Sequence, residues 1–296
     1  MNRAAAALIV VLSINVGAGF SRRAPTEVGA YSSTAEQEVY GPSDFVRITG
    51  NSLQARYDGA LAEGRRGTTE TFWIAYQFPV RPGVRVNASD GNVNISRGRN
   101  SDGIEWVDQT TALQRVGLFL LMRKSDGLIE KSRILNLDQD FRVHDRKVYW
   151  IGESGAQESL ALLAMLVDAA PQRASSSLLM TLGLHPEPGA AESLLRIART
   201  SSSTQVRKNA LFWLGQELSR QAGEELEKMA NSDPEIEIQK QAVFAISQRN
   251  NDEAVTSLLR IAREHPNAAV RKQAIFWLGQ KRDPRVLDFF EQMLKK

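Results

Sequence analysis

The sequence predicts an α+β protein with two folded modules, a β-rich N-terminal module followed by an all-α, right-handed solenoid. A helical pattern recurs every 32 residues in the second half of the chain, which indicates stacked helix pairs. Short aromatic and β-branched segments separated by turn residues precede it and indicate strands. With 296 residues the chain is long enough for about two domains. We expect a signal peptide at 1–18, a flexible tether at 19–43, the β-rich module at 44–152 and the solenoid at 153–296.

The N-terminal segment resembles a secretory signal. Met1-Asn2-Arg3 supplies one positive charge, Ala4 to Leu12 form an apolar run, and Val16-Gly17-Ala18 place tolerated residues at the −3 and −1 positions of a cleavage site. An uncleaved membrane anchor is the alternative, although Ser13 and Asn15 interrupt the run. The mature chain is therefore expected to be exported, periplasmic or extracellular, and to contain no integral membrane span.

Composition and charge exclude several function classes. The chain has no cysteine, which removes disulfides, thiol nucleophiles, cysteine-based metal sites and an N-terminal lipid anchor. The 37 Lys and Arg residues against 34 Asp and Glu give a net charge of +3, and two of these three charges lie in residues 1–30. The folded modules are nearly neutral, so no nucleic-acid partner is expected. The three histidines have no HExxH spacing, so neither a metal nor a cofactor is expected.

The β-rich module is expected to be an antiparallel sheet or small sandwich with one helix near residues 52–63. Lys124-Ser125-Asp126-Gly127 separates two strand-like segments, which predicts a hairpin with Asp-Gly in its turn. Asp90-Gly91 predicts a second hairpin turn, since the calcium-loop pattern fails at Ile95 and Ser101. The expected strands are 72–78, 84–87, 116–123, 128–137, 141–144 and 147–151.

The solenoid is predicted from an internal repeat. Ser193–Gln216 and Ser257–Gln280 are identical at 16 of 24 positions at an offset of 64 residues, and half that offset reaches the related segment Glu225–Gln248. A degenerate copy at Ala161–Leu184 and a last partial copy from Phe289 bring the array to about four and a half repeats. Each repeat has two amphipathic stripes, and one helix pair cannot bury its own apolar face, so the pairs are expected to stack.

The segments VRKNALFWLGQ and VRKQAIFWLGQ resemble HEAT repeats, most closely the short bacterial HEAT-like type first associated with phycobiliprotein lyases. Arg207 and Arg271 match the arginine of that family, whereas position 239 is Gln. The resemblance covers residues 155–296 and implies an α-solenoid that binds other proteins. Lyase activity belongs to only some members of the family and is not implied here.

Two columns of the repeat are candidate binding residues. One contains the cations Arg196, Lys228 and Arg260, with Arg199 and Arg263 one turn further on. The other contains Phe212, Phe244 and Phe276, with Trp213 and Trp277 beside them. A solvated charged face and plain core packing are the ordinary interpretations. Since adjacent Phe and Trp side chains cannot both point inward, we expect Trp213 and Trp277 to reach the surface and anchor a partner.

No catalytic residue is predicted. Ser154 stands in Gly152-Glu153-Ser154-Gly155-Ala156, which departs from the G-x-S-x-G motif at Ala156, and Ser154 with Gln157 is interpreted as a helix capping box. The leading hypothesis is a non-enzymatic, exported scaffold whose solenoid binds a protein partner in the cell envelope. The alternative is an enzyme, with acids such as Asp138 and Asp140, or a glycan-binding protein using Trp73, Tyr76 or Trp106, with its site in the β-rich module or at its junction with the solenoid.

Overall fold

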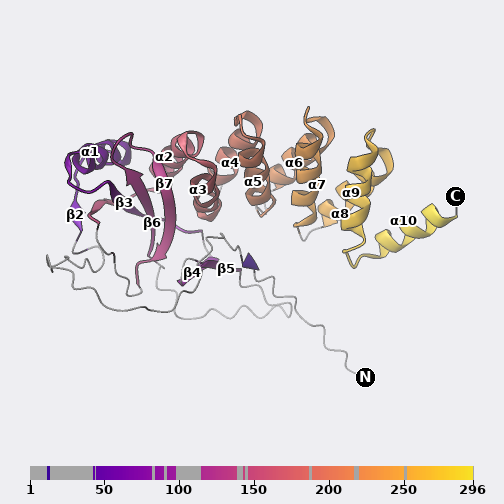
Figure 1. Cartoon of the computed structure of the whole chain (residues 1–296). Coiled ribbons are helices and arrows are strands. Elements are labelled where there is room, and N and C mark those ends of the chain that lie inside the picture. Colours follow the sequence, from indigo (N-terminus) through magenta and orange to yellow (C-terminus); the bar gives the residue numbers. More distant parts are fainter. Residues whose placement is uncertain are drawn as a thin grey trace, which may run out of the picture. The chain divides into compact units, whose positions relative to one another are not determined.

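The computed structural model describes residues 12–13, 43, 45–81, 84–89, 92–97, 115–138, 143, 146–186, 189–216, 220–249 and 252–295. The chain divides into two compact units, Met1–Leu162 and Leu163–Lys296, shown in indigo to magenta and in magenta to yellow (Figure 1). Apart from Leu12, Ser13 and Ser43, the expected signal peptide and tether lie outside the described residues, so both remain predictions. Within the described ranges, none of the helices has both the length and the apolar character that a bilayer-spanning segment requires.

A five-stranded mixed sheet forms the centre of the first unit, in the order β2-β8-β3-β6-β7. The antiparallel pairs are β3 with β6 and β6 with β7, whereas β8 runs parallel to both β2 and β3. The expectation of an antiparallel sheet is therefore wrong for β8. Helix α1 returns the chain between β2 and β3, so these two strands point the same way, and β8 fills the place between them. The bounds are β2 Val46–Arg47, α1 Leu53–Arg66, β3 Thr71–Phe78, β6 Val116–Arg123, β7 Ile129–Asn136 and β8 Val148–Glu153.

The predicted hairpin between β6 and β7 is present. Between β6 and β7, Gly127 has φ +72° and its N–H donates to the carbonyl of Arg123 at 2.8 Å, as an Asp-Gly turn requires. A second sheet pairs β4 (Val84–Ser89) with β5 (Asn92–Arg97), and β5 also pairs with β1 (Leu12–Ser13). Of the expected strand 141–144, the structure describes only Val143, and the Asp90-Gly91 turn lies outside the described residues.

One face of the five-stranded sheet is covered by α1. Phe72, Ile74 and Tyr76 alternate along β3 and are almost fully buried on this face. Gly64 of α1 lies directly over Phe72, and a Cβ at this position would collide with the phenyl ring. The absence of a side chain at Gly64 therefore allows the helix to approach the strand closely.

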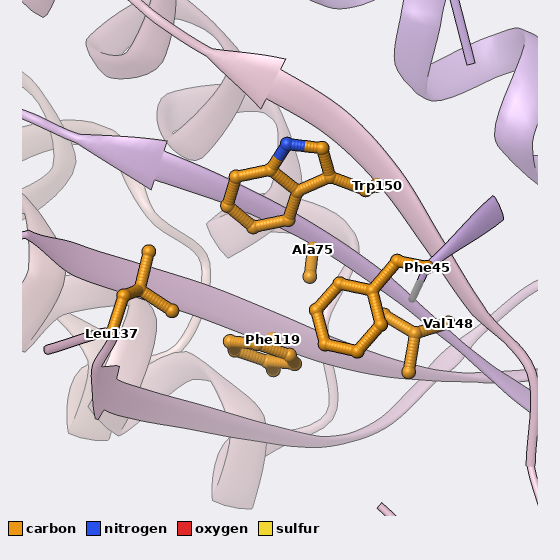
Figure 2. Packing of buried hydrophobic residues seen from close by; sticks show 6 residues of the cluster. All are labelled: Phe45, Ala75, Phe119, Leu137, Val148 and Trp150. Carbon is orange, nitrogen blue, oxygen red and sulfur yellow. The ribbon is translucent and has the colours of Figure 1, made fainter. Parts of the chain in front are cut away.

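The opposite face of the sheet carries an aromatic cluster. Figure 2 shows the rings of Phe45, Phe119 and Trp150 gathered around Ala75. The ring centroids lie 6.0 Å apart for Phe45 and Phe119 and 6.1 Å apart for Phe45 and Trp150. All members are buried, so packing accounts for them without a ligand. The cluster consists of Phe45, Ala75, Phe119, Leu137, Val148 and Trp150.

Helix α2 (Ala156–Ala169) packs its first turns against this sheet. The hydroxyl groups of Tyr76 and Ser159 lie 3.0 Å apart, and burial raises the pKa of Tyr76. The interpretation of Ser154 as a helix cap is wrong: its hydroxyl donates to the carbonyl of Gln77 at 3.1 Å, and α2 begins two residues later. Ser154 thus ties the end of β8 to β3 and does not begin the helix.

The second unit consists of stacked helices that follow one another in a row (Figure 1). In each repeat a first helix packs against its own second helix, and the second helices pack more closely against one another than the first helices do. Small residues allow this close spacing: a Cβ at Gly215 of α5 would lie 2.7 Å from the carbonyl oxygen of Ala245 in α7. The helices are α3 Gln172–Leu184, α4 Gly189–Thr200, α5 Thr204–Gly215, α6 Arg220–Ser232, α7 Ile236–Ser247, α8 Asp252–Glu264, α9 Ala268–Leu278 and α10 Pro284–Leu294.

Two histidines close helix ends in this unit. His185 follows α3, is fully buried, and has Nδ1 2.7 Å from the carbonyl oxygen of Thr181. His265 follows α8 and accepts the N–H of Asn267 at Nδ1, so its Nε2–H donates to the carbonyl of Ala230 in α6 at 3.1 Å. Both imidazole rings thus contact backbone groups at the turns between helices.

The stability of the protein should fall in acid through His185. Burial lowers the pKa of His185 in the folded protein to about 4, whereas the unfolded chain keeps a value near 6.5. Between these two pH values only the unfolded chain binds the proton, so folding loses up to about 3 kcal/mol as the pH falls through this window. Urea unfolding of wild type and His185→Asn at pH 7 and 4.5 should show a steeper loss for wild type. Parallel losses would contradict this assignment.

Candidate protein-interaction surface

Aromatic side chains form a ladder along the second helices α5, α7 and α9. The rings of Phe212 and Phe244 are stacked at a centroid distance of 6.2 Å and an angle of 13°. Phe244 contacts Trp277 at 5.0 Å, and Trp277 contacts Phe276 at 4.9 Å. Phe276 is 56% exposed, and the other three rings of this ladder are half-buried. We call Phe212, Phe244, Phe276 and Trp277 the aromatic ladder.

The two tryptophans that were expected to reach the surface differ. Trp213 is only 6% exposed because its indole ring lies over Gly183 of α3, where a Cβ would be 2.6 Å from the ring. The expectation that Trp213 presents an anchor is therefore wrong. Ser247 precedes Trp277 by the same number of residues as Gly183 precedes Trp213, so the glycine is replaced by serine in this repeat. Trp277 is half-buried, and its ring contacts the ring of Phe244. Of the adjacent pair Phe276 and Trp277, the phenylalanine is the more exposed.

A column of lysines, which the sequence reasoning missed, accompanies the ladder. Lys208, Lys240 and Lys272 stand four residues before the three phenylalanines, so they share a helix face with them. Glu237 pairs with Lys240 at 2.9 Å and with Lys208 at 3.9 Å, and the Lys240 hydrogen bond holds the pKa of Glu237 below its usual range. Lys272 is exposed and forms no ion pair within the described part of the chain. The 32-residue recurrence of lysine could have identified this column from the sequence.

The expected cation column lies on the first helices, and most of its members are paired with carboxylates from neighbouring helices. Arg196 approaches Asp168 of α2 at 3.8 Å, Arg199 of α4 binds Glu225 of α6, and Lys228 binds Glu225 at 2.7 Å. Arg260 of α8 binds Glu227 of α6. Arg263 instead lies 5.2 Å from the ring centroid of Phe289. This column therefore joins adjacent repeats and offers little unpaired charge to a partner.

Arg207, which matches the family arginine, is buried and holds two repeats together. Its Nε donates to the carbonyl of Ala198 at 2.7 Å, and its Nη1 donates to Glu235 at 2.7 Å. Its Nη2 donates to Asp233, which is buried at 9% exposure. The guanidinium thus connects α4 to the turn between α6 and α7.

The equivalent positions make simpler contacts. Gln239 donates to the carbonyl of Asp233 at 2.7 Å, and Arg271 donates to the carbonyls of His265 and Pro266 at 2.7 and 2.9 Å. In all three repeats the side chain satisfies backbone carbonyls at or just after the end of a first helix. Only at Arg207, among these three, does the chain add a pair of carboxylates.

The described candidate residues of the N-terminal unit, Asp138, Tyr76 and Trp73, each have contacts within the fold. Asp138 accepts hydrogen bonds from the backbone N–H and Nε of Arg115 at 3.0 and 2.7 Å, which lowers its pKa and keeps it ionised. Tyr76 is fully buried and Trp73 packs against the cluster of Figure 2. Asp140 and Trp106 lie outside the described residues. The described ranges contain no group of three or more His, Asp or Glu placed to hold a metal ion.

Comparison with known protein families agrees with the repeat. Residues 223–296 match the family described as HEAT repeats, which confirms the resemblance over the last quarter of the chain. No curated protein matches the chain. A solved structure, the complex of CpcE and CpcF of phycocyanin lyase from Nostoc sp. PCC7120, matches with 20% identity and a TM-score of 0.31, covering 41% of this chain and 85% of that one. A solenoid of HEAT repeats indicates a protein-interaction scaffold.

Replacement of Arg207 should destabilise the solenoid far more than replacement of a surface arginine. Arg207→Ala leaves Asp233 buried without its cation, which should cost about 3–5 kcal/mol in the free energy of unfolding. Arg260→Ala removes an arginine whose side chain is 57% exposed and should cost about 1 kcal/mol or less. Urea unfolding of the two variants measures the difference. Equal losses would show that the Arg207 network contributes nothing beyond a surface pair.

Proposed function

We propose that this protein is an exported, non-enzymatic scaffold that binds a protein partner in the cell envelope through the second-helix face of its solenoid. The observation that carries the proposal is the aromatic ladder with the lysine column beside it. Half-buried rings held against one another lose little conformational freedom when a partner covers them, and exposed aromatic side chains are frequent anchors of binding energy. Phe276 and Lys272 are the most accessible members of the two columns.

The cation column is a weaker candidate for the same role. Arg196, Arg199, Lys228 and Arg260 already have carboxylate partners, and a ligand would have to displace these before it gained their charge. Ion pairs at the surface contribute little free energy, whether to folding or to binding. Because these ion pairs already lie between adjacent repeats, we assign the cation column to contacts between repeats. The face of α5, α7 and α9 therefore remains the better binding surface, with Phe276, Trp277 and Lys272 as its proposed contacts.

Export is supported by the sequence of the N-terminal segment. The positive start, the apolar run from Ala4 to Leu12 and the Val16-Gly17-Ala18 site follow the order of a secretory signal. The absence of cysteine is compatible with an oxidising compartment, because the protein has no thiol that could be oxidised there. Removal of residues 1–18 would take away β1 (Leu12–Ser13) and leave the remaining strands and helices attached to a polar segment.

A photo-crosslinker should distinguish the two faces. Benzoylphenylalanine at position 276 or 272 in the full chain, irradiated in cells of the source organism, should give an adduct of one discrete mass. The same group at position 228, whose lysine side chain is 64% exposed on the first-helix face, should give none. Adding Phe276→Ser to the protein labelled at position 272 should reduce the adduct severalfold, as expected for loss of an anchor. Adducts from position 228 alone would contradict the proposed face.

Signal cleavage has a direct test. The protein recovered from the envelope fraction should begin at Gly19, as shown by intact mass, because cleavage is expected after Ala18. Ala18→Leu should block processing by placing a large residue at the −1 position, whereas the control Ala24→Leu should be processed normally. Recovery of the uncleaved chain in the cytosol for all three proteins would contradict export.

A further inference from the structure

Adjacent helix pairs of the solenoid are joined at their turns by a set of three equivalent positions. Between the α4–α5 pair and the α6–α7 pair these positions hold Arg207, Asp233 and Glu235, which form the network described above. Arg207 and Asp233 fill the space between the two turns, since they are only 7% and 9% exposed. At this interface the place is therefore occupied by a guanidinium and its carboxylates.

The next interface fills the same place without a charged pair. Thirty-two residues further along the chain, the equivalent positions hold Gln239, His265 and Asn267. Gln239 donates to the carbonyl of Asp233 at 2.7 Å, and the buried ring of His265 donates to the carbonyl of Ala230 at 3.1 Å. Two successive interfaces are thus closed by large polar side chains that have hydrogen-bond partners.

The interface before these two, between the α2–α3 pair and the α4–α5 pair, has three serines instead. The equivalent positions hold Ser175, Ser201 and Ser203, and all three line a cavity of about 340 Å³ within the second unit. Because serine is much shorter than arginine, glutamate or histidine, this cavity lies where the neighbouring interfaces have large side chains. We call it the serine cavity, and its polar lining consists of Asp168, Ser175, Thr200, Ser201, Ser202 and Ser203.

The lining of the serine cavity is rich in hydrogen-bond acceptors. Thr200 donates its hydroxyl hydrogen to the carbonyl of Arg196 at 2.9 Å, and Ser175 donates its own to the carbonyl of Pro171 at 3.1 Å. A hydroxyl group whose hydrogen is used in this way can only accept further hydrogen bonds. Asp168 adds a carboxylate, and Arg196 stays 3.8 Å away from it, which is too far for a hydrogen bond. The cavity therefore suits a ligand that is rich in donors.

The charge of the cavity favours a cation. Among the described lining residues, Asp168 is the one with a charge, and it stands at the C-terminal end of α2, where unpaired carbonyls add negative potential. The N-terminus of α5 is capped by its own Ser203, whose hydroxyl oxygen accepts the N–H of Val206 at 3.4 Å. An anion in the cavity would therefore meet a carboxylate and a helix end of its own sign.

We propose that the serine cavity binds a guanidinium group, which takes the place that the guanidinium of Arg207 occupies at the next interface. A guanidinium keeps its charge and presents five N–H donors in one plane, so it can bond the carboxylate of Asp168 and the serine oxygens together. An ammonium group is a compact and strongly hydrated point charge, which suits acceptors spread around a cavity less well. The guanidinium can belong to a free small molecule or to an arginine residue of a protein, since both have this chemistry.

This site does not depend on the function proposed above. None of the residues that line the serine cavity belongs to the aromatic ladder or to the lysine column. Failure of one proposal would thus leave the other unaffected.

Valine methyl groups report directly on the site, because Val167 and Val206 also line the cavity. Nα-acetyl-L-arginine amide added to the methyl-labelled full chain should shift the NMR signals of both valines saturably, and Nα-acetyl-L-lysine amide should not. Asp168→Asn should weaken binding by about fivefold, as expected when one half-exposed ion pair is lost. The control Glu264→Gln removes the exposed acid at the equivalent position of α8 and should change the affinity by less than about twofold.

Closing the cavity gives a second test. Ser201→His introduces the residue that stands at the equivalent position as His265, so the protein should fold and the valine signals should no longer respond to the arginine amide. Loss of the response in Ser201→His and weaker binding in Asp168→Asn would support the proposal. Equal shifts with the lysine amide, or unchanged affinity in Asp168→Asn, would overturn it. Shifts caused by inorganic phosphate and not by the arginine amide would make the cavity an anion site and also overturn it.

Free L-arginine distinguishes the two sources of the guanidinium. Tighter binding of the free amino acid than of its acetylated amide would assign the cavity to a small molecule whose charged α-groups are also recognised. Tighter binding of the amide would assign it to an arginine residue of a protein. Either order supports recognition of a guanidinium, and no response to both compounds would contradict it.

Discussion

The solenoid depends on one constraint, that a pair of amphipathic helices cannot bury its own apolar surface. Every first helix has a stripe that only a second helix can cover, and every pair then needs another pair beside it. Leu194, Leu226 and Leu258 are fully buried because this condition is met three times in succession.

Close packing of the second helices decides which side chains reach the surface. Gly183 and Gly215 let neighbouring helices approach closely, and the rings of Phe212 and Phe244 stack along this layer. The first helices lie further apart, and long Arg, Lys and Glu side chains fill the wider space between them. One layer therefore presents aromatic rings and the other presents neutralised charge, although both come from the same repeat.

Much of the fold could be predicted from the sequence because its patterns are local. Repeat spacing located the helices, and the Asp126-Gly127 turn located the β6–β7 hairpin. The insertion of β8 between β2 and β3 could not be predicted, because strand neighbours far apart in the sequence leave no periodic signal. The candidate surface was half found: the aromatic column was identified, but the burial of Trp213 depends on Gly183, a residue 30 positions away in another helix.

The pattern of charged residues on the first helices recurs after two repeats and not after one. Helix α6 carries the acids Glu225 and Glu227, whereas α4 and α8 have Ser193, Leu195, Ser257 and Leu259 at those positions and supply Arg199 and Arg260 to α6. Positions 207, 213 and 215 alternate in the same way, with Arg, Trp and Gly repeated after 64 residues as Arg271, Trp277 and Gly279 but replaced by Gln239, Ala245 and Ser247 between them. Over these three repeats, two kinds of helix pair therefore alternate. Loss of the middle pair would place Arg199 against Ser257 and Arg260 against Leu195 instead of glutamate, so an array of this kind changes length without conflict only two pairs at a time.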